Sequence, residues 1–209
     1  MPFEPINTLI SRLVALPVGN IDTDRIIPAR FLKAVDSEGF AENLFFDWRY
    51  LPDGSRNPDF ILNKPEGQGK ILLTGKNFGC GSSREHAAWA LYQYGFRVII
   101  SSGFADIFRN NAFNNGLLPI EFPEQQLSEI LALHGKHPEQ DWMISLSDQF
   151  LKPLGPDAHM PTAPYFFSIN LLKKQCLLQG RDLINYLTDM KQEIVDFEQT
   201  HRNYRPDEL

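Results

Sequence analysis

Cysteine is scarce in this sequence, whose 209 residues include only Cys80 and Cys176. Two cysteines are too few for a disulfide scaffold or for a four-cysteine metal site within one chain. No apolar run approaches the roughly 18 residues that a membrane-spanning helix needs. The start of the chain carries charged residues such as Glu4 and Arg12, where a secretory signal would place a continuous apolar stretch. These absences predict a protein of a reducing, cytoplasmic compartment with no membrane partner.

An excess of basic residues is also missing. Lysine and arginine number 20 against 26 aspartates and glutamates, which leaves a formal net charge of −6. Proteins that bind nucleic acid usually present a basic face, so the sequence predicts no nucleic-acid partner. With 43% hydrophobic and 22% charged residues, the composition is that of an ordinary globular protein. The length and the lack of internal repeats predict a single domain over residues 1–209.

The middle of the chain alternates short apolar runs with helical patterns. Strands are predicted at residues 71–74, 97–101 and 117–122, and helices at 83–94 and 104–113. This alternation is typical of βαβ units, which form a parallel sheet. The sequence therefore predicts an α/β fold with a central parallel portion.

The flanking segments are less regular. Residues 20–24 form a polar turn, and residues 36–69 read as a long surface excursion around the aromatic run at 44–50. Apolar positions between 182 and 204 recur at helical spacing, which predicts an amphipathic helix that packs on the protein. Further elements are predicted as strands at 9–18, 142–146 and 165–167, helices at 29–35 and 124–134, and a helix with Cys176 in the core.

The loop between the 71–74 strand and the helix that follows is the most informative stretch. Gly79 and Gly81 can adopt conformations that turn successive backbone N–H groups to one side. The helix start adds free N–H donors and the positive end of a dipole, and Ser82 or Ser83 is expected to cap it. The guanidinium of Arg84 can grip a carboxylate or phosphate with two hydrogen bonds. Together these groups predict an anion-binding site.

Known loop motifs do not match this stretch. A P-loop needs Lys followed by Ser or Thr after its last glycine, and the dinucleotide fingerprint needs a glycine where Arg84 stands. The Gly-x-Ser-x-Gly nucleophile elbow is absent as well. The alternative to a functional site is a purely structural glycine-rich turn with a serine cap. Two serines, an arginine and a histidine at one helix start favour a functional site.

Residues 79–87 (GCGSSREHA) strongly resemble the signature of the small subunits of 3-isopropylmalate dehydratase, in the aconitase superfamily. Residues 20–28 (NIDTDRIIP) are similar to the N-terminal motif of the family, and residues 45–49 (FFDWR) to its aromatic segment. Residues 103–108 and 114–119 are similar to its later motifs, so the resemblance covers nearly the whole chain.

This resemblance implies a fold and an activity. The fold would be the swivelling β/β/α domain of aconitase-like enzymes. The enzyme would be a hydro-lyase of leucine biosynthesis that interconverts 2-isopropylmalate and 3-isopropylmalate through 2-isopropylmaleate. A [4Fe–4S] cluster would lie in a separate large subunit, the heterodimer partner, and this chain would bind neither cofactor nor metal. The cysteine count agrees, because a cluster commonly needs three or four thiolates.

The resemblance also implies roles for individual residues. Ser82 would remove a proton from a substrate carbon and return it, while Ser83 and Arg84, with Gly81, would hold the carboxylates of a small dicarboxylate substrate. Serine is a poor base unless its alkoxide is stabilised, which loop amides, a helix N-terminus and Arg84 would favour. Asp24 and His86 are expected as possible supporting residues. Asp22, Thr23 and Asp24 either orient the loop or the substrate, or simply form a turn.

Three alternatives stay open from the sequence. The substrate of the small subunit can be homoaconitate or another 2-alkylmalate, because the loop specifies carboxylate binding and not the alkyl group. Cys80 and His86 can form a thiol hydrolase that acts alone. The loop can also belong to a non-catalytic anion-binding module.

Overall fold

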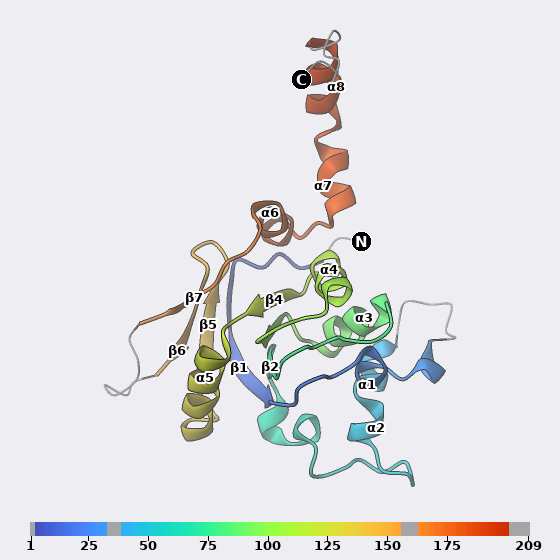
Figure 1. Cartoon of the computed structure of the whole chain (residues 1–209), viewed down its shortest axis with the longest axis vertical. Helices are drawn as coiled ribbons and strands as arrows, with labels where there is room; N and C mark the ends of the chain where they lie inside the picture. The colour runs from blue at the N-terminus through green and yellow to red at the C-terminus, as the bar shows by residue number, and fades with distance from the viewer. Residues whose placement is uncertain (1–2, 33–38, 156–162, 201–209) are drawn as a thin grey trace.

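The computed structural model describes residues 3–32, 39–155 and 163–200, and it is built around one seven-stranded sheet with the strand order β4-β3-β2-β1-β5-β6-β7 (Figure 1). The strands are β1 Thr8–Leu16, β2 Ile71–Thr74, β3 Val98–Ser101, β4 Leu118–Glu121, β5 Asp141–Ser145, β6 Phe150–Leu154 and β7 Tyr165–Phe166. Strands β1 to β4 pair in parallel, which confirms the predicted parallel portion. Strands β5, β6 and β7 extend the sheet in antiparallel pairs, and β6 has no counterpart among the predicted strands.

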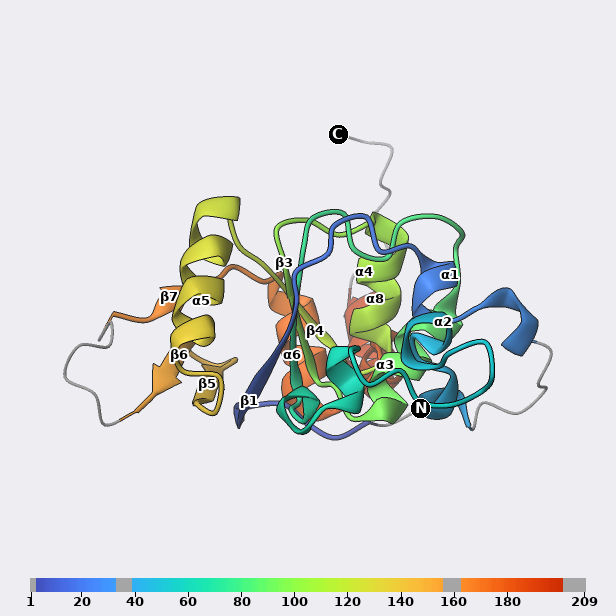
Figure 2. The same cartoon turned by 90° about the horizontal axis from the view of Figure 1, so that it is seen from below.

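Helices cover both faces of the sheet (Figure 2). Helices α3 (Glu85–Tyr94) and α4 (Asp106–Asn114) pack on one face, and α5 (Glu124–Lys136) and α6 (Leu171–Gln179) on the other. Alternate residues of β2 point to opposite faces of the sheet. Leu72 packs in the core under α3 and α4, and Ile71 and Leu73 pack in the core under α5 and α6. Burial on both faces explains why the parallel strands read as continuous apolar runs in the sequence.

The segment after β1 differs from its prediction. The polar turn at 20–24 runs into a short helix, α1 (Thr23–Ile26), and the predicted 29–35 helix is a 3-10 turn at Ala29–Phe31. Its positions 33–35 lie outside the described residues. The expectation of a surface excursion at 36–69 is confirmed for residues 51–56, which are exposed, but it is wrong for Phe40, Leu44 and Phe45, which are fully buried. Short turns organise it, namely 3-10 turns Phe40–Asn43, Ile61–Asn63 and Pro65–Gly67 and helix α2 (Phe46–Arg49).

The C-terminal helix also differs from its prediction. It is two helices, α7 (Leu183–Asp189) and α8 (Lys191–Thr200), which extend away from the sheet (Figure 1). Neither buries a residue, and Ile184 and Phe197 are 76% and 60% exposed. The expected packing on the protein is therefore wrong, since periodicity reports an apolar face but not a neighbour to cover it. The predicted end at 201–204 lies outside the described residues.

No helix in the described part of the chain is long and apolar enough to cross a bilayer.

Arg49 at the end of α2 ties the 39–50 segment together. Its side chain is buried, and one guanidinium nitrogen, Nη1, donates to the carbonyl oxygens of Ala41, Glu42 and Leu44 at 3.1, 3.2 and 3.2 Å. The guanidinium also lies over the ring of Tyr94, 5.0 Å from its centroid. A single cation thus donates to three carbonyls of this segment, of which that of Ala41 also accepts from Leu44 N–H at 3.3 Å.

Replacing the buried arginine at position 49 should make the protein less stable. We expect Arg49→Met to lower the free energy of unfolding by about 3 kcal/mol, because the charged donor is removed while its carbonyl acceptors remain and lose this partner. Arg12→Met is the control, since Arg12 makes a surface ion pair with Glu139 that is worth at most about 1 kcal/mol. Urea unfolding of both variants measures the difference, and equal stabilities would contradict the role of Arg49.

Candidate functional site

The turn at 20–24 and the glycine loop after β2 run side by side. The pairing brings the N-terminal motif of the sequence against the loop that carries the predicted site, although the two are nearly 60 residues apart. The backbone hydrogen bonds that join them are Asn20 N–H to Lys76 O at 2.8 Å, Gly79 N–H to Ile21 O at 2.7 Å and Thr23 N–H to Cys80 O at 2.9 Å.

Two glycines give the loop the shape that the sequence predicted. Gly79 and Gly81 have φ angles of 75° and 89°, in the left-handed region that other residues resist. Gly79 also lies against the ring of Phe108 on α4, and a Cβ at this position would overlap that ring. Its conformation and its packing both require glycine.

Helix α3 starts later than predicted, which overturns one expectation. Its N-cap is Arg84, in an extended conformation and without a side-chain cap, so the expected capping by Ser82 or Ser83 is wrong. Both serines precede the N-cap and are exposed to solvent. Within the described residues, no hydrogen bond is donated by the backbone N–H groups of Gly81, Ser82 and Ser83. These hydroxyls and amides are therefore available to an anion.

Arg84 is held beside the loop by Asp24. The guanidinium Nη1 of Arg84 forms an ion pair with Asp24 Oδ1, and the Arg84 side chain is 16% exposed while that of Asp24 is 52% exposed. The hydrogen bond from Arg84 lowers the pKa of Asp24, with the charge of the guanidinium acting in the same direction. Asp24 therefore keeps its negative charge throughout the neutral range and orients one edge of the guanidinium.

His86 and Cys80 do not form a pair. His86 lies in the first turn of α3, where its ring contacts Phe40 and Trp89 at centroid distances of 5.3 and 4.7 Å. In the part of the chain that the structure describes, it has no hydrogen bond to Cys80 or to a loop serine. Cys80 is partly exposed in the loop.

The two cysteines lie in different parts of the fold and do not fit an iron–sulfur cluster. Cys80 lies in the loop, whereas Cys176 is buried on α6, where loss of solvation raises the pKa of its thiol. Across residues 3–32, 39–155 and 163–200, no three His, Cys, Asp or Glu side chains converge in a way that would hold a metal ion. The described residues thus contain no ligand set for such a cofactor.

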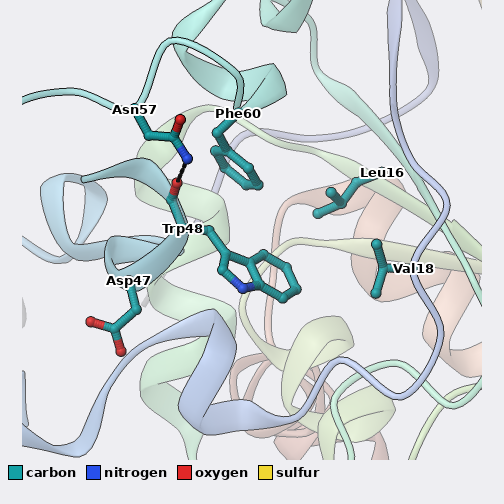
Figure 3. A pocket seen from close by; sticks show the side chains of 6 residues that line it. All are labelled: Leu16, Val18, Asp47, Trp48, Asn57 and Phe60. Atoms are coloured by element: carbon teal, nitrogen blue, oxygen red, sulfur yellow. Dashed lines mark hydrogen bonds between the residues drawn. The ribbon is translucent and has the colours of Figure 1, made fainter. Parts of the chain in front are cut away.

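An apolar pocket of about 320 Å³ lies between the end of β1 and the 47–60 segment (Figure 3). The indole of Trp48 points toward Leu16 and Val18, whereas Asp47 points away from them. The carbonyl of Val18 accepts a hydrogen bond from Gly75 N–H, at the start of the glycine loop. None of the predicted site residues lines this pocket, so the predicted site is the open loop and not this cavity. The lining residues are Leu16, Val18, Asp47, Trp48, Asn57 and Phe60.

The asparagine pair beside the loop was missed in the sequence, and the role of Thr23 was predicted only in general terms. Asn20 and Asn77 both have left-handed φ angles, of 55° and 56°, and Asn77 Nδ2 donates to Asn20 Oδ1 at 2.9 Å. Thr23 is 1% exposed, and its hydroxyl donates to Ser82 O at 2.9 Å. Asn20 follows Gly19, and an asparagine next to a glycine hints at a left-handed turn. The sequence allowed Thr23 to orient the loop, but it did not indicate a contact with Ser82.

Comparison with known proteins gives a consistent result. Residues 11–125 match the family described as the aconitase C-terminal domain. The chain is 48% identical over 200 residues, 95% of each chain, to a 3-isopropylmalate dehydratase small subunit of Chloroflexus aggregans. It is 50% identical over 196 residues, 93% of this chain and 97% of the relative, to that of Azobacteroides pseudotrichonymphae. The crystal structure of a 3-isopropylmalate dehydratase (LeuD) from Methanocaldococcus jannaschii superposes with a TM-score of 0.63 at 25% identity, covering 92% of this chain and 99% of that one.

Glycine at position 79 should be essential to the loop. We expect Gly79→Ala to lower the free energy of unfolding by about 3 kcal/mol, because its Cβ meets Phe108 and the left-handed conformation adds strain. Gly135→Ala is the matched control: no heavy atom lies within 4 Å of a Cβ at this position in α5, so the change should be neutral or slightly stabilising. Thermal and urea unfolding compare the two, and a Gly79→Ala protein of unchanged stability would contradict this packing.

Proposed function

The chain belongs to the family of 3-isopropylmalate dehydratase small subunits, with the aconitase C-terminal domain fold that the sequence predicted, and on that premise we propose how its loop works. The protein is the small subunit of a hydro-lyase that interconverts 2-isopropylmalate and 3-isopropylmalate in leucine biosynthesis. The names of its relatives favour this substrate over homoaconitate or another 2-alkylmalate. The observation that carries the site assignment is the exposed Ser82–Ser83 pair, with unpaired amides, beside Arg84.

Ser82 is the proposed catalytic base. As an alkoxide, its side-chain oxygen takes the proton from the substrate carbon and becomes the hydroxyl, which returns the proton when water is added. This step needs negative charge on the serine oxygen, and the unpaired amides at 81–83, the positive end of α3 and the guanidinium of Arg84 all stabilise such a charge. The overall charge of −6 does not oppose this, because the positive potential is local.

Arg84, Ser83 and the amide of Gly81 bind the substrate carboxylates in this proposal. Asp24 occupies Nη1 of Arg84, which leaves the other edge of the guanidinium for a substrate oxygen. Asp24 is therefore a support that presets the direction of Arg84. His86 supports the start of α3 through its contacts with Phe40 and Trp89 and does not itself touch the substrate.

The partner is a large subunit, as the small-subunit names of the relatives imply. Gly81, Ser82 and Ser83 are exposed here, so a second surface must cover them before water is excluded from the reaction. We place the [4Fe–4S] cluster on that subunit, in a cytoplasmic heterodimer. The cluster would bind the substrate hydroxyl as a Lewis acid, and the residues described above act on the carbon-bound proton and the carboxylates.

The proposal is tested by reconstitution with the iron–sulfur large subunit. Isomerisation should require both chains, and Ser82→Ala should lower kcat by about 10³-fold with a similar KM, because only the general base is lost. Ser128→Ala, on the exposed side of α5, is the control and should keep full activity. Turnover by the small subunit alone would favour a Cys80-based hydrolase. Near-normal turnover of Ser82→Ala would favour a module without a catalytic role.

The carboxylate assignment predicts a different kinetic pattern. Arg84→Lys should raise KM about tenfold or more, because an ammonium cannot make two parallel hydrogen bonds while also meeting Asp24. Arg12→Lys changes the same side chain in a surface pair and should leave KM unchanged. Steady-state kinetics of the reconstituted complex separate the two, and an unchanged KM for Arg84→Lys would refute the assignment.

A further inference from the structure

The stretch that carries Ser82 is weakly held. Gly81, Ser82 and Ser83 are exposed, and none of their backbone N–H groups donates a hydrogen bond within the described residues. In the same part of the chain, the carbonyl of Ser82 accepts one hydrogen bond, from the hydroxyl of Thr23 at 2.9 Å. The orientation of the Ser82 side chain therefore depends on that contact.

Thr23 is itself rigid. It is 1% exposed and begins α1, its N–H donates to Cys80 O at 2.9 Å, and its carbonyl accepts from Ile27 N–H at 2.9 Å. Asp22 caps the same turn through Arg25 N–H at 2.7 Å. A β-branched side chain has few χ1 choices, so the hydroxyl is presented to the loop in one direction.

We propose that Thr23 is a positioning residue for the reaction, which holds the backbone of Ser82 so that its hydroxyl meets the substrate carbon. The inference rests on the proposed role of Ser82 as base. Because Ser82 is an exposed residue and this hydrogen bond is only partly buried, water can satisfy the carbonyl when the Thr23 hydroxyl is removed, so the fold loses little. Catalysis loses more, since a displacement of about 1 Å at a reacting group can cost up to about 100-fold in rate.

The test compares three variants in the reconstituted complex. Thr23→Val keeps the shape and removes the hydroxyl, and we expect its kcat to fall about 10- to 100-fold with KM changed less than about threefold. Thr23→Ser restores the hydroxyl and should recover most of kcat. Tyr94→Phe is the matched control: it also removes one hydroxyl that donates to a distant backbone carbonyl, that of Leu62 at 3.2 Å, and should keep kcat.

A double-mutant cycle separates positioning from a general structural effect. If Thr23 acts through Ser82, adding Thr23→Val to Ser82→Ala should cause no further loss of kcat, so the two effects should not add. Additive losses, a normal kcat for Thr23→Val, or a Thr23→Ser variant as slow as Thr23→Val would each overturn the proposal. If Thr23→Val does not fold, the ratio of kcat between Thr23→Ser and Thr23→Ala measures the hydroxyl instead. If Ser82→Ala is active, the proposed base is wrong. If Ser82→Ala is inactive and Thr23→Val is normal, only the role of Thr23 fails.

Discussion

The site depends on the close approach of two backbone segments, the turn at 20–24 and the loop at 76–82. Gly79 can donate to Ile21 and pack against Phe108 only because it has no Cβ and tolerates a left-handed φ angle. Once this contact forms, Thr23 reaches the Ser82 carbonyl and Asp24 reaches Arg84. Consecutive residues of one turn thus hold the proposed base and the proposed carboxylate-binding residue in a common frame.

The same arrangement accounts for the need for a second chain. The groups that would stabilise negative charge, the amides at 81–83 and the start of α3, face solvent in this subunit. Hydrogen bonds and charges are weaker in water than in an enclosed site. An enzyme built on this loop gains its full electrostatic effect only when another surface covers it, which agrees with the small-subunit family to which the chain belongs.

Several features of the fold were predictable because their cause is local. The apolar runs of β2, β3 and β4 and the helices between them follow from short-range patterns, and the structure confirms them. The aromatic part of the 39–69 segment was wrongly predicted to lie at the surface, since nothing in its sequence shows that Arg49 would bind the carbonyls of Ala41, Glu42 and Leu44 or that Phe45 would be buried. The C-terminal helices were misread in the opposite sense: their apolar spacing was visible, but Ile184 and Phe197 stay exposed.

The α/β class, the glycine loop and the types of residue on it could be predicted from the residues alone, because backbone freedom, periodicity and ionisable groups are properties of the residues. Three features of the site follow from the folded chain alone: Arg84 and not a serine precedes the first turn of α3, Asp24 pairs with Arg84, and Thr23 donates to the Ser82 carbonyl. These contacts join positions about 60 residues apart, and the parallel pairing of β1 with β2 brings them together. The geometry of these contacts therefore depends on how the strands pair and not on any local sequence pattern.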